Sequence, residues 1–193
     1  IVTCRSVSDG GKSEFDQAAA GGSMDLKAHF VRELESEYQR RIAAAARAES
    51  EATGESDPAP AEAHRREDAK EAAHSGRLAS GHRRRRKQAV AELERLLEFA
   101  EGGMRGFRSS DRIDVGALVD VRVEDEEGED ERTVFFLPVG AGTELSGPGG
   151  DGFVTVVTPK SPVGKALFRA QVDDSFEIVV DERDREWTGL YLT

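Results

Sequence analysis

Apolar residues recur at every fourth position in the first strongly patterned segment of the chain. They are Leu26, Phe30, Leu34, Tyr38 and Ile42. This spacing keeps the apolar side chains on one face of an α-helix. Because no helix breaker follows until Gly54, the pattern predicts one helix over residues 25–53, roughly 43 Å long at about 1.5 Å per residue.

A second helical pattern extends from about Glu62 to Glu101. Its larger apolar residues follow the 3, 4, 3 spacing of a heptad repeat, at Val90, Leu93, Leu97 and Ala100. A segment rich in Gly and Pro separates the two patterns, which together predict an antiparallel coiled-coil hairpin. Gly76 and Gly81 each weaken a helix by about 1 kcal/mol relative to alanine, so the early half of the second helix is expected to be irregular.

Beyond residue 117 the pattern changes to the alternation of β-strands. Val119, Val121 and Val123 alternate with polar residues. Further strands are predicted at residues 133–137, 153–157, 175–180 and 186–192, with a glycine-rich loop over residues 140–152. Ser161 and Pro162 suit the N-cap and first residue of a short helix. We expect about five strands and one short helix, which is an α+β fold.

Charge and residue usage divide the chain near Gly102 and Gly103. The 193 residues carry 38 acidic and 27 basic side chains, for a net charge of −11. Residues 1–104 hold 19 acidic and 17 basic residues, whereas residues 105–193 hold 19 and 10, so the two parts carry −2 and −9. Three segments are expected: a disordered leader over residues 1–23, a helical hairpin over 24–103 and a sheet domain over 104–193. Met24 is the expected native start of the protein.

Composition excludes several classes of protein. The single cysteine, Cys4, rules out a disulfide framework and a multi-cysteine zinc site. No apolar run approaches the ~20 residues that cross a membrane. The negative charge argues against nonspecific nucleic-acid binding as the main activity. The histidines, which have no metal-ligand spacing and are expected at the surface, are His29, His64, His74 and His82.

Four carboxylates gather around the turn predicted between the two helices. They are Glu51, Glu55, Asp57 and Glu62. A narrow rod of two helices cannot enclose a pocket, so its tip is its most informative point. Two interpretations stay open: the acids cap and solvate the turn, or the stalk presents them to complete a Mg²⁺ site elsewhere. The ligand spacing of an EF-hand is absent.

A basic run follows His82 on the second predicted helix. It consists of Arg83, Arg84, Arg85, Arg86 and Lys87. These consecutive cations span more than one turn, so they cannot all share one helix face. They form either a solvated collar or a surface for phosphate or an acidic protein.

Three motifs in the second half carry a resemblance to a known family. They are Ser161-Pro162-Val163-Gly164-Lys165-Ala166-Leu167, Val172-Asp173-Asp174 and Arg185-Glu186-Trp187. Behind a helical hairpin and a glycine hinge, this order of parts resembles the bacterial Gre transcript cleavage factors, the GreA/GreB family, from Met24 onward. The resemblance implies an FKBP-like antiparallel sheet domain that docks on RNA polymerase beside its secondary channel. Docking would use Ser161, Pro162, Gly164 and Lys165.

The resemblance further implies a cytoplasmic elongation factor that is not itself an enzyme. Its coiled coil would enter the channel, and its tip acids would help the polymerase hold a second Mg²⁺ and hydrolyse backtracked RNA. Glu55 and Asp57 are the expected metal-sharing acids, with Glu51, Glu62 and Asp68 as further candidates. The basic run Arg83 to Lys87 would contact nascent RNA or polymerase. We expect a monomer with no cofactor of its own and no membrane partner.

Two features depart from the family pattern. The family tip usually carries Asp and Glu three residues apart, whereas Pro58 stands three residues after Glu55. Arg169-Ala170 also replaces the usual glycine after the short helix. An alternative function therefore stays open, a regulator that occupies the channel without promoting cleavage. A free-standing coiled-coil adaptor is a third class.

Overall fold

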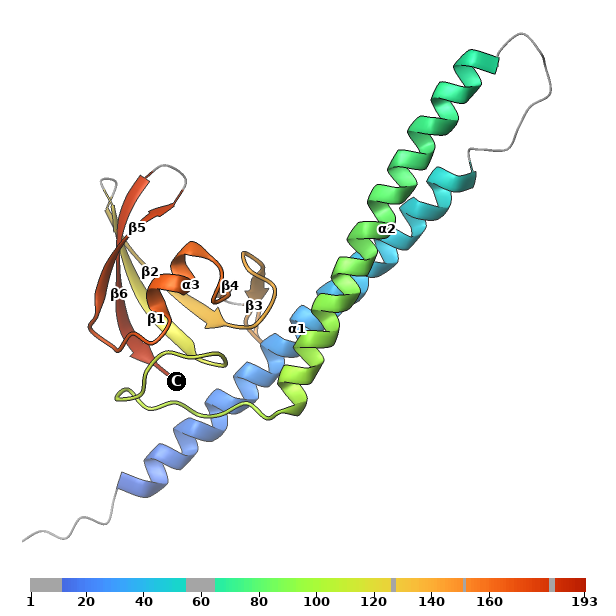
Figure 1. The fold of residues 1–193 in the computed structure, drawn as a ribbon. Coiled ribbons are helices and arrows are strands. Elements are labelled where there is room, and N and C mark those ends of the chain that lie inside the picture. The colour runs from blue at the N-terminus through green and yellow to red at the C-terminus, as the bar shows by residue number, and fades with distance from the viewer. Residues whose placement is uncertain (1–11, 55–64, 126–127, 151, 181–182) are drawn as a thin grey trace, which may run out of the picture.

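The computed structural model describes residues 12–54, 65–125, 128–150, 152–180 and 183–193. Two long helices precede a sheet with one short helix (Figure 1). In chain order the elements are α1 (Lys12–Gly54), α2 (Arg65–Glu101), β1 (Leu118–Asp125), β2 (Gly128–Phe136), β3 (Glu144–Ser146), β4 (Phe153–Val157), α3 (Pro162–Leu167), β5 (Ser175–Val180) and β6 (Arg183–Leu192). The predicted α+β class is confirmed. None of the helices in the described ranges has an apolar stretch that could cross a lipid bilayer.

The two long helices form the expected hairpin, which projects well past the sheet (Figure 1). Helix α1 begins at Lys12 rather than near residue 25, so residues 12–23, which the sequence assigned to a leader, are helical. The Ser23 hydroxyl hydrogen-bonds the Thr193 hydroxyl and ties this part of the helix to the sheet domain. A helix that is already formed extends at little cost, because only its nucleation is unfavourable.

Helix α2 is continuous through Gly76 and Gly81, so the expectation of an irregular early half was wrong. Ser75 and Ala79 are buried in this half of the helix. Burial of these two side chains favours the helix against the glycine cost of about 1 kcal/mol each.

The heptad register of α2 also differs from the predicted one. Val90 and Leu97 are 37% and 38% exposed, whereas Ala89 and Leu96 are buried. Eight buried or half-buried positions are spaced alternately by 4 and 3 residues, and we call them the α2 seam: Ser75, Ala79, His82, Arg86, Ala89, Leu93, Leu96 and Ala100. This register could not be read from hydrophobicity, because two of its positions are occupied by the polar residues His82 and Arg86.

The sheet has six strands in the order β3-β4-β2-β1-β6-β5. It is mixed rather than wholly antiparallel, because β2 and β4 run parallel while the other neighbours are antiparallel. Strand β3 was missed because it is three residues long and lies inside the glycine-rich loop predicted over residues 140–152. A strand of that length has no measurable periodicity.

Two apolar cores lie on opposite faces of the sheet. Alternation along β2 divides its side chains between them: Val134 and Phe136 join the core under α3, and Phe135 joins the core under the hairpin. Val119, Val121 and Val123 of β1 all face the α3 side, as the alternation predicted. The sheet therefore serves as a common layer between α3 and the hairpin.

Candidate functional site

The base of the hairpin is fixed to the sheet by its largest apolar residues. Phe30, Leu34, Tyr38 and Leu96 are at most 2% exposed, and Phe30 packs on Phe135 with ring centroids 6.1 Å apart. The predicted apolar face of α1 is thus confirmed. This face packs against the sheet as well as against α2.

Polar contacts between α1 and β3 fix the orientation of the hairpin. Glu33 Oε2 accepts a hydrogen bond from the Ser146 amide at 2.8 Å, and His29 Nε2 lies 3.1 Å from the Ser146 carbonyl oxygen. His29 is half-buried rather than a surface residue. A carboxylate and an imidazole therefore satisfy the backbone of one edge-strand residue.

A lysine is wholly buried where α1 meets the segment after α2. Lys27 is 0% exposed, donates to the Arg105 carbonyl oxygen at 3.1 Å and lies 4.9 Å from the centre of the Phe107 ring. Burial, with a smaller effect of the Arg105 charge, lowers the pKa of Lys27 to about 8. The sequence did not single out this residue, because lysine at one position of an amphipathic helix normally faces solvent.

Farther along the hairpin, ion pairs rather than apolar contacts join the two helices. Glu49 of α1 accepts from Arg83 Nε at 2.7 Å and from Arg86 Nε at 3.1 Å. The Arg83 hydrogen bond holds the pKa of Glu49 below its usual value. Arg83 and Arg86 of the basic run are therefore partly neutralised by the opposite helix.

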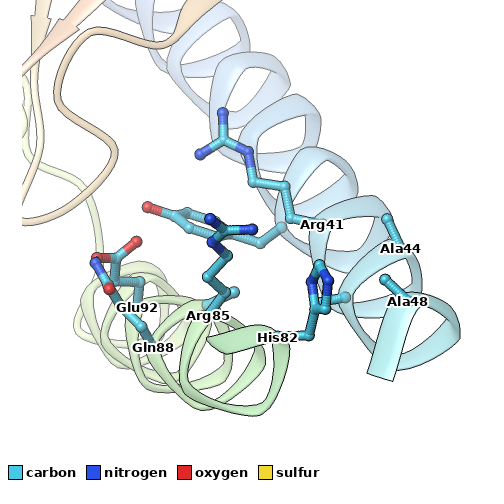
Figure 2. Close-up of a pocket in the computed structure, with 10 residues that line it drawn as sticks. Arg41, Ala44, Ala48, His82, Arg85, Gln88 and Glu92 are labelled. Carbon is cyan, nitrogen blue, oxygen red and sulfur yellow. The ribbon is translucent and has the colours of Figure 1, made fainter. Parts of the chain in front are cut away.

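The remaining cations of the basic run point elsewhere. Arg84 and Lys87 are exposed, and neither has an ion pair within the described part of the chain. Arg85 lines a groove between α1 and α2 (Figure 2). The prediction that the run cannot share one face is confirmed.

The groove between α1 and α2 has a volume of about 510 Å³, so the expectation that two helices alone could not form a pocket was wrong. Tyr38, Arg41, His82 and Arg85 contribute its aromatic and cationic side chains, and Glu92 its carboxylate. Figure 2 shows Arg41 reaching from α1, and His82 and Arg85 from α2. The sequence predicted a surface position for His82. Its place between the helices follows from the observed register of the α2 seam, which was not predicted.

The Ser-Pro-x-Gly-Lys motif builds α3. Ser161 caps the helix: its Oγ accepts from the Gly164 amide at 3.1 Å and donates to the Thr158 carbonyl oxygen at 2.8 Å. A Cβ on Gly164 would lie 1.9 Å from that carbonyl oxygen, so only glycine fits there. Ser161 and Gly164 thus stabilise the start of α3, whereas the side chains of Pro162 and Lys165 are exposed.

Arg169 takes the place where the family resemblance expects glycine. Its φ of 70° lies in the left-handed region that favours glycine. The Arg112 Nη1 donates to the Arg169 carbonyl oxygen at 2.9 Å, and the Arg169 guanidinium lies 5.2 Å from the centre of the Phe168 ring. The departure in sequence therefore leaves the backbone in the conformation that a glycine would adopt.

The predicted tip acids fall mostly outside the described residues. This holds for Glu55, Asp57 and Glu62, and for the side chain of Asp68, whose backbone belongs to α2. Glu51 is exposed near the end of α1. Within the described ranges, no group of three or more His, Cys, Asp and Glu side chains could hold a metal ion.

Comparisons with known proteins find structural neighbours of low sequence identity. No protein-family model matches the chain, and no curated protein matches its sequence. The solved structures that align along most of its length include the following three. GreA factor homolog 1 (Gfh1) of Thermus thermophilus has 16% identity and a TM-score of 0.33, covering 84% of this chain and 92% of its own. Gfh1 of Thermus aquaticus has 14% identity and a TM-score of 0.34, covering 88% and 95%. A further structure of the transcription factor Gfh1 has 19% identity and a TM-score of 0.33, covering 82% and 92%.

Proposed function

We propose that this chain is a Gre-like transcription factor that binds bacterial RNA polymerase and places its hairpin in the channel leading to the active site. The observation that carries the proposal is the hairpin itself, a rod anchored at one end to a folded domain (Figure 1). The resemblance of the motif over residues 161–167 to the Gre family suggests RNA polymerase as the partner.

The rod has reach beyond its anchor. Arg41 Nη2 donates to Thr143 Oγ1 at 3.5 Å, close to the sheet's contact with α1. From Arg41 the helix continues to Gly54, roughly 20 Å farther at about 1.5 Å per residue. A narrow rod of this kind suits entry into a channel, and the sheet domain would remain outside to dock.

Docking would use the exposed residues of α3. Pro162 and Lys165 lie at the surface, while Ser161 and Gly164 hold the helix in place. Charge reversal by Lys165→Glu is therefore expected to weaken binding to polymerase. The matched control is Arg132→Glu on β2, where the exposed arginine pairs with Asp130.

Stimulation of RNA cleavage is the finer part of the proposal. Glu55 and Asp57 would lend oxygen ligands to a Mg²⁺ held by the polymerase, with Glu51, Glu62 and Asp68 as further candidates. Such a metal would activate water and stabilise charge on the reacting phosphate. The chain itself would not be an enzyme, and Arg84 and Lys87 would be free to meet nascent RNA.

A second candidate function is a channel-binding regulator without cleavage activity. It is favoured by Pro58, which stands three residues after Glu55 and has no side-chain ligand for a metal. Under this alternative the hairpin would act by occupying the channel.

Two measurements test the proposal. The full chain is first mixed with bacterial RNA polymerase, and co-migration on gel filtration is the expected result; free migration of the chain would instead favour a coiled-coil adaptor. The chain is then added to a backtracked elongation complex, where faster shortening of the transcript is expected.

Loss of that activity in the Glu55→Ala/Asp57→Ala variant, with retention in the matched Glu94→Ala/Glu98→Ala variant, would support the role of the tip acids. Binding without shortening would establish the second candidate.

A further inference from the structure

The groove between α1 and α2 is hollow because its floor is made of small residues. The floor consists of Ala44, Ala45, Ala48 and Ala89. A stable two-helix seam carries large apolar side chains at its heptad positions, yet the α2 seam has His82 and Arg86 there. The hairpin thus has an open space where a coiled coil would have a core.

Basic side chains from both helices border this space. Arg41 comes from α1, and His82 and Arg85 come from α2 (Figure 2). Arg83 and Arg86, which face Glu49, are ion-paired. Arg85 and His82, by contrast, have no hydrogen bond or ion pair to any residue that the structure describes. Arg41 pairs with Glu37 at 2.8 Å through Nε and donates to Thr143 Oγ1 at 3.5 Å through Nη2, which leaves three of its five N–H donors available.

A buried hydroxyl group adds a second, independent observation. Tyr38 lines the groove at 1% exposure, and its hydroxyl lies near the Glu92 carboxylate without a well-formed hydrogen bond to any described residue. Buried polar groups without a partner are rare and call for an explanation. Burial and the neighbouring Glu92 raise the pKa of Tyr38, so the phenol keeps its proton and remains a donor.

We propose that this groove binds a small organic phosphate of about mononucleotide size. Arginine guanidinium groups bind phosphate oxygens in pairs of parallel hydrogen bonds, so Arg41 and Arg85 would hold the phosphate with help from His82. The volume of about 510 Å³ lies within the range of small-molecule sites. Gln88 and Glu92, which are joined by a 3.0 Å hydrogen bond, offer acceptors for amino or hydroxyl groups of the organic part. The alanine floor would contact its apolar face.

The test is a calorimetric titration of the full chain alone, without polymerase, at low ionic strength. The probes are guanosine monophosphate, adenosine monophosphate, inorganic phosphate and a single-stranded oligoribonucleotide. The expected result is one bound mononucleotide per chain, with weaker binding of inorganic phosphate because the organic part is missing. Arg85→Ala and Arg41→Ala are each expected to weaken mononucleotide binding about tenfold.

Matched variants distinguish a specific mononucleotide site in the groove from nonspecific attraction of phosphate to a basic surface. Arg95→Ala and Arg32→Ala remove the same charge from exposed positions of α2 and α1 outside the groove, and are expected to leave the mononucleotide affinity within about twofold. Equal losses in all four variants would overturn the proposal. So would binding of the oligoribonucleotide without binding of either mononucleotide, since that pattern marks a track for RNA. Helical content by circular dichroism checks that every variant folds.

Discussion

The two ends of the hairpin are held together by different kinds of contact, although the same two helices form both ends. At the base, Phe30, Leu34 and Leu96 are at most 2% exposed and join the core of the sheet domain. Toward the free end the contacts are made by alanines and by the ion pairs of Glu49. The comparison shows that helices in one heptad register can pack on a folded domain at one end and leave an open groove between them toward the other.

This difference has an energetic basis. Large apolar side chains at the base each contribute about 2 kcal/mol or more on burial. Exposed ion pairs contribute between nothing and about 1 kcal/mol. The base should therefore unfold with the sheet domain, while the free end should open locally at lower cost.

Removing a large side chain from the base should have the greatest effect. Leu34 is wholly buried against the loop before β3, and a Cβ added to Gly140 would lie 3.0 Å from its Cδ2. Leu34→Ala is expected to lower the free energy of unfolding by about 3 kcal/mol, measured by urea denaturation. The control Leu97→Ala removes the same atoms from a 38% exposed position and should cost less than about 1 kcal/mol. Similar losses for both would contradict the division between the two ends.

The buried lysine at the base should produce a smaller, pH-dependent effect. With the pKa of Lys27 lowered to about 8, the folded chain loses this proton before the unfolded chain does. The unfolded state then binds more protons above pH 8, so stability should rise from there toward the usual lysine pKa of about 10.4.

Substitution isolates that contribution. Lys27→Met is expected to raise the free energy of unfolding at pH 7 by about 1 kcal/mol and to flatten the alkaline rise. Lys165→Met, at an exposed position of α3, is the control and should leave the rise intact. An unchanged pH profile in Lys27→Met would show that the lysine remains solvated. Urea denaturation at several pH values supplies both curves.

The smallest effect is expected at the free end. Glu49→Gln removes the charge that holds Arg83 and Arg86, and global unfolding should not change. Amide hydrogen exchange should nevertheless become faster around residues 47–53 and 82–87. Glu51→Gln, two residues farther along α1 and exposed, should leave exchange as it is.

Acid should reproduce the effect of that substitution in the unmodified chain. Because the folded pKa of Glu49 is lowered, its contribution is present above the unfolded value of about 4.3. The contribution is lost as the pH falls through the folded pKa. Protection at pH 3 that equals protection at pH 6 would count against a role for this ion pair.

Much of the fold could be predicted from local pattern. Ser161 and Pro162 marked the start of α3, and alternation at Val119, Val121 and Val123 marked β1, because these signals depend on neighbours in sequence. The α2 seam could not be predicted in the same way. Val90 and Leu97 look like seam residues by hydrophobicity, yet packing against α1 and the sheet turned Ala89 and Leu96 inward.

The candidate site shows the same limit. The basic run was visible in sequence, but its division among Glu49, the groove and solvent depends on α1, which lies more than 30 residues earlier in the chain. Lys27 and the buried Tyr38 hydroxyl depend on contacts that form only in the folded molecule. The acids predicted at the tip, Glu55 and Asp57, stay a prediction.

The place of β2 in the sheet has a mechanical consequence. The hairpin rests on Phe135, and β2 is hydrogen-bonded on both sides, to β1 and to β4. A sideways force on the free end of the rod would therefore act as a torque on an interior strand. Both neighbouring strands would have to shear together, whereas an edge strand could peel away one hydrogen bond at a time. The rod is thus supported by an interior strand as well as by the edge strand β3, whose Ser146 it also contacts.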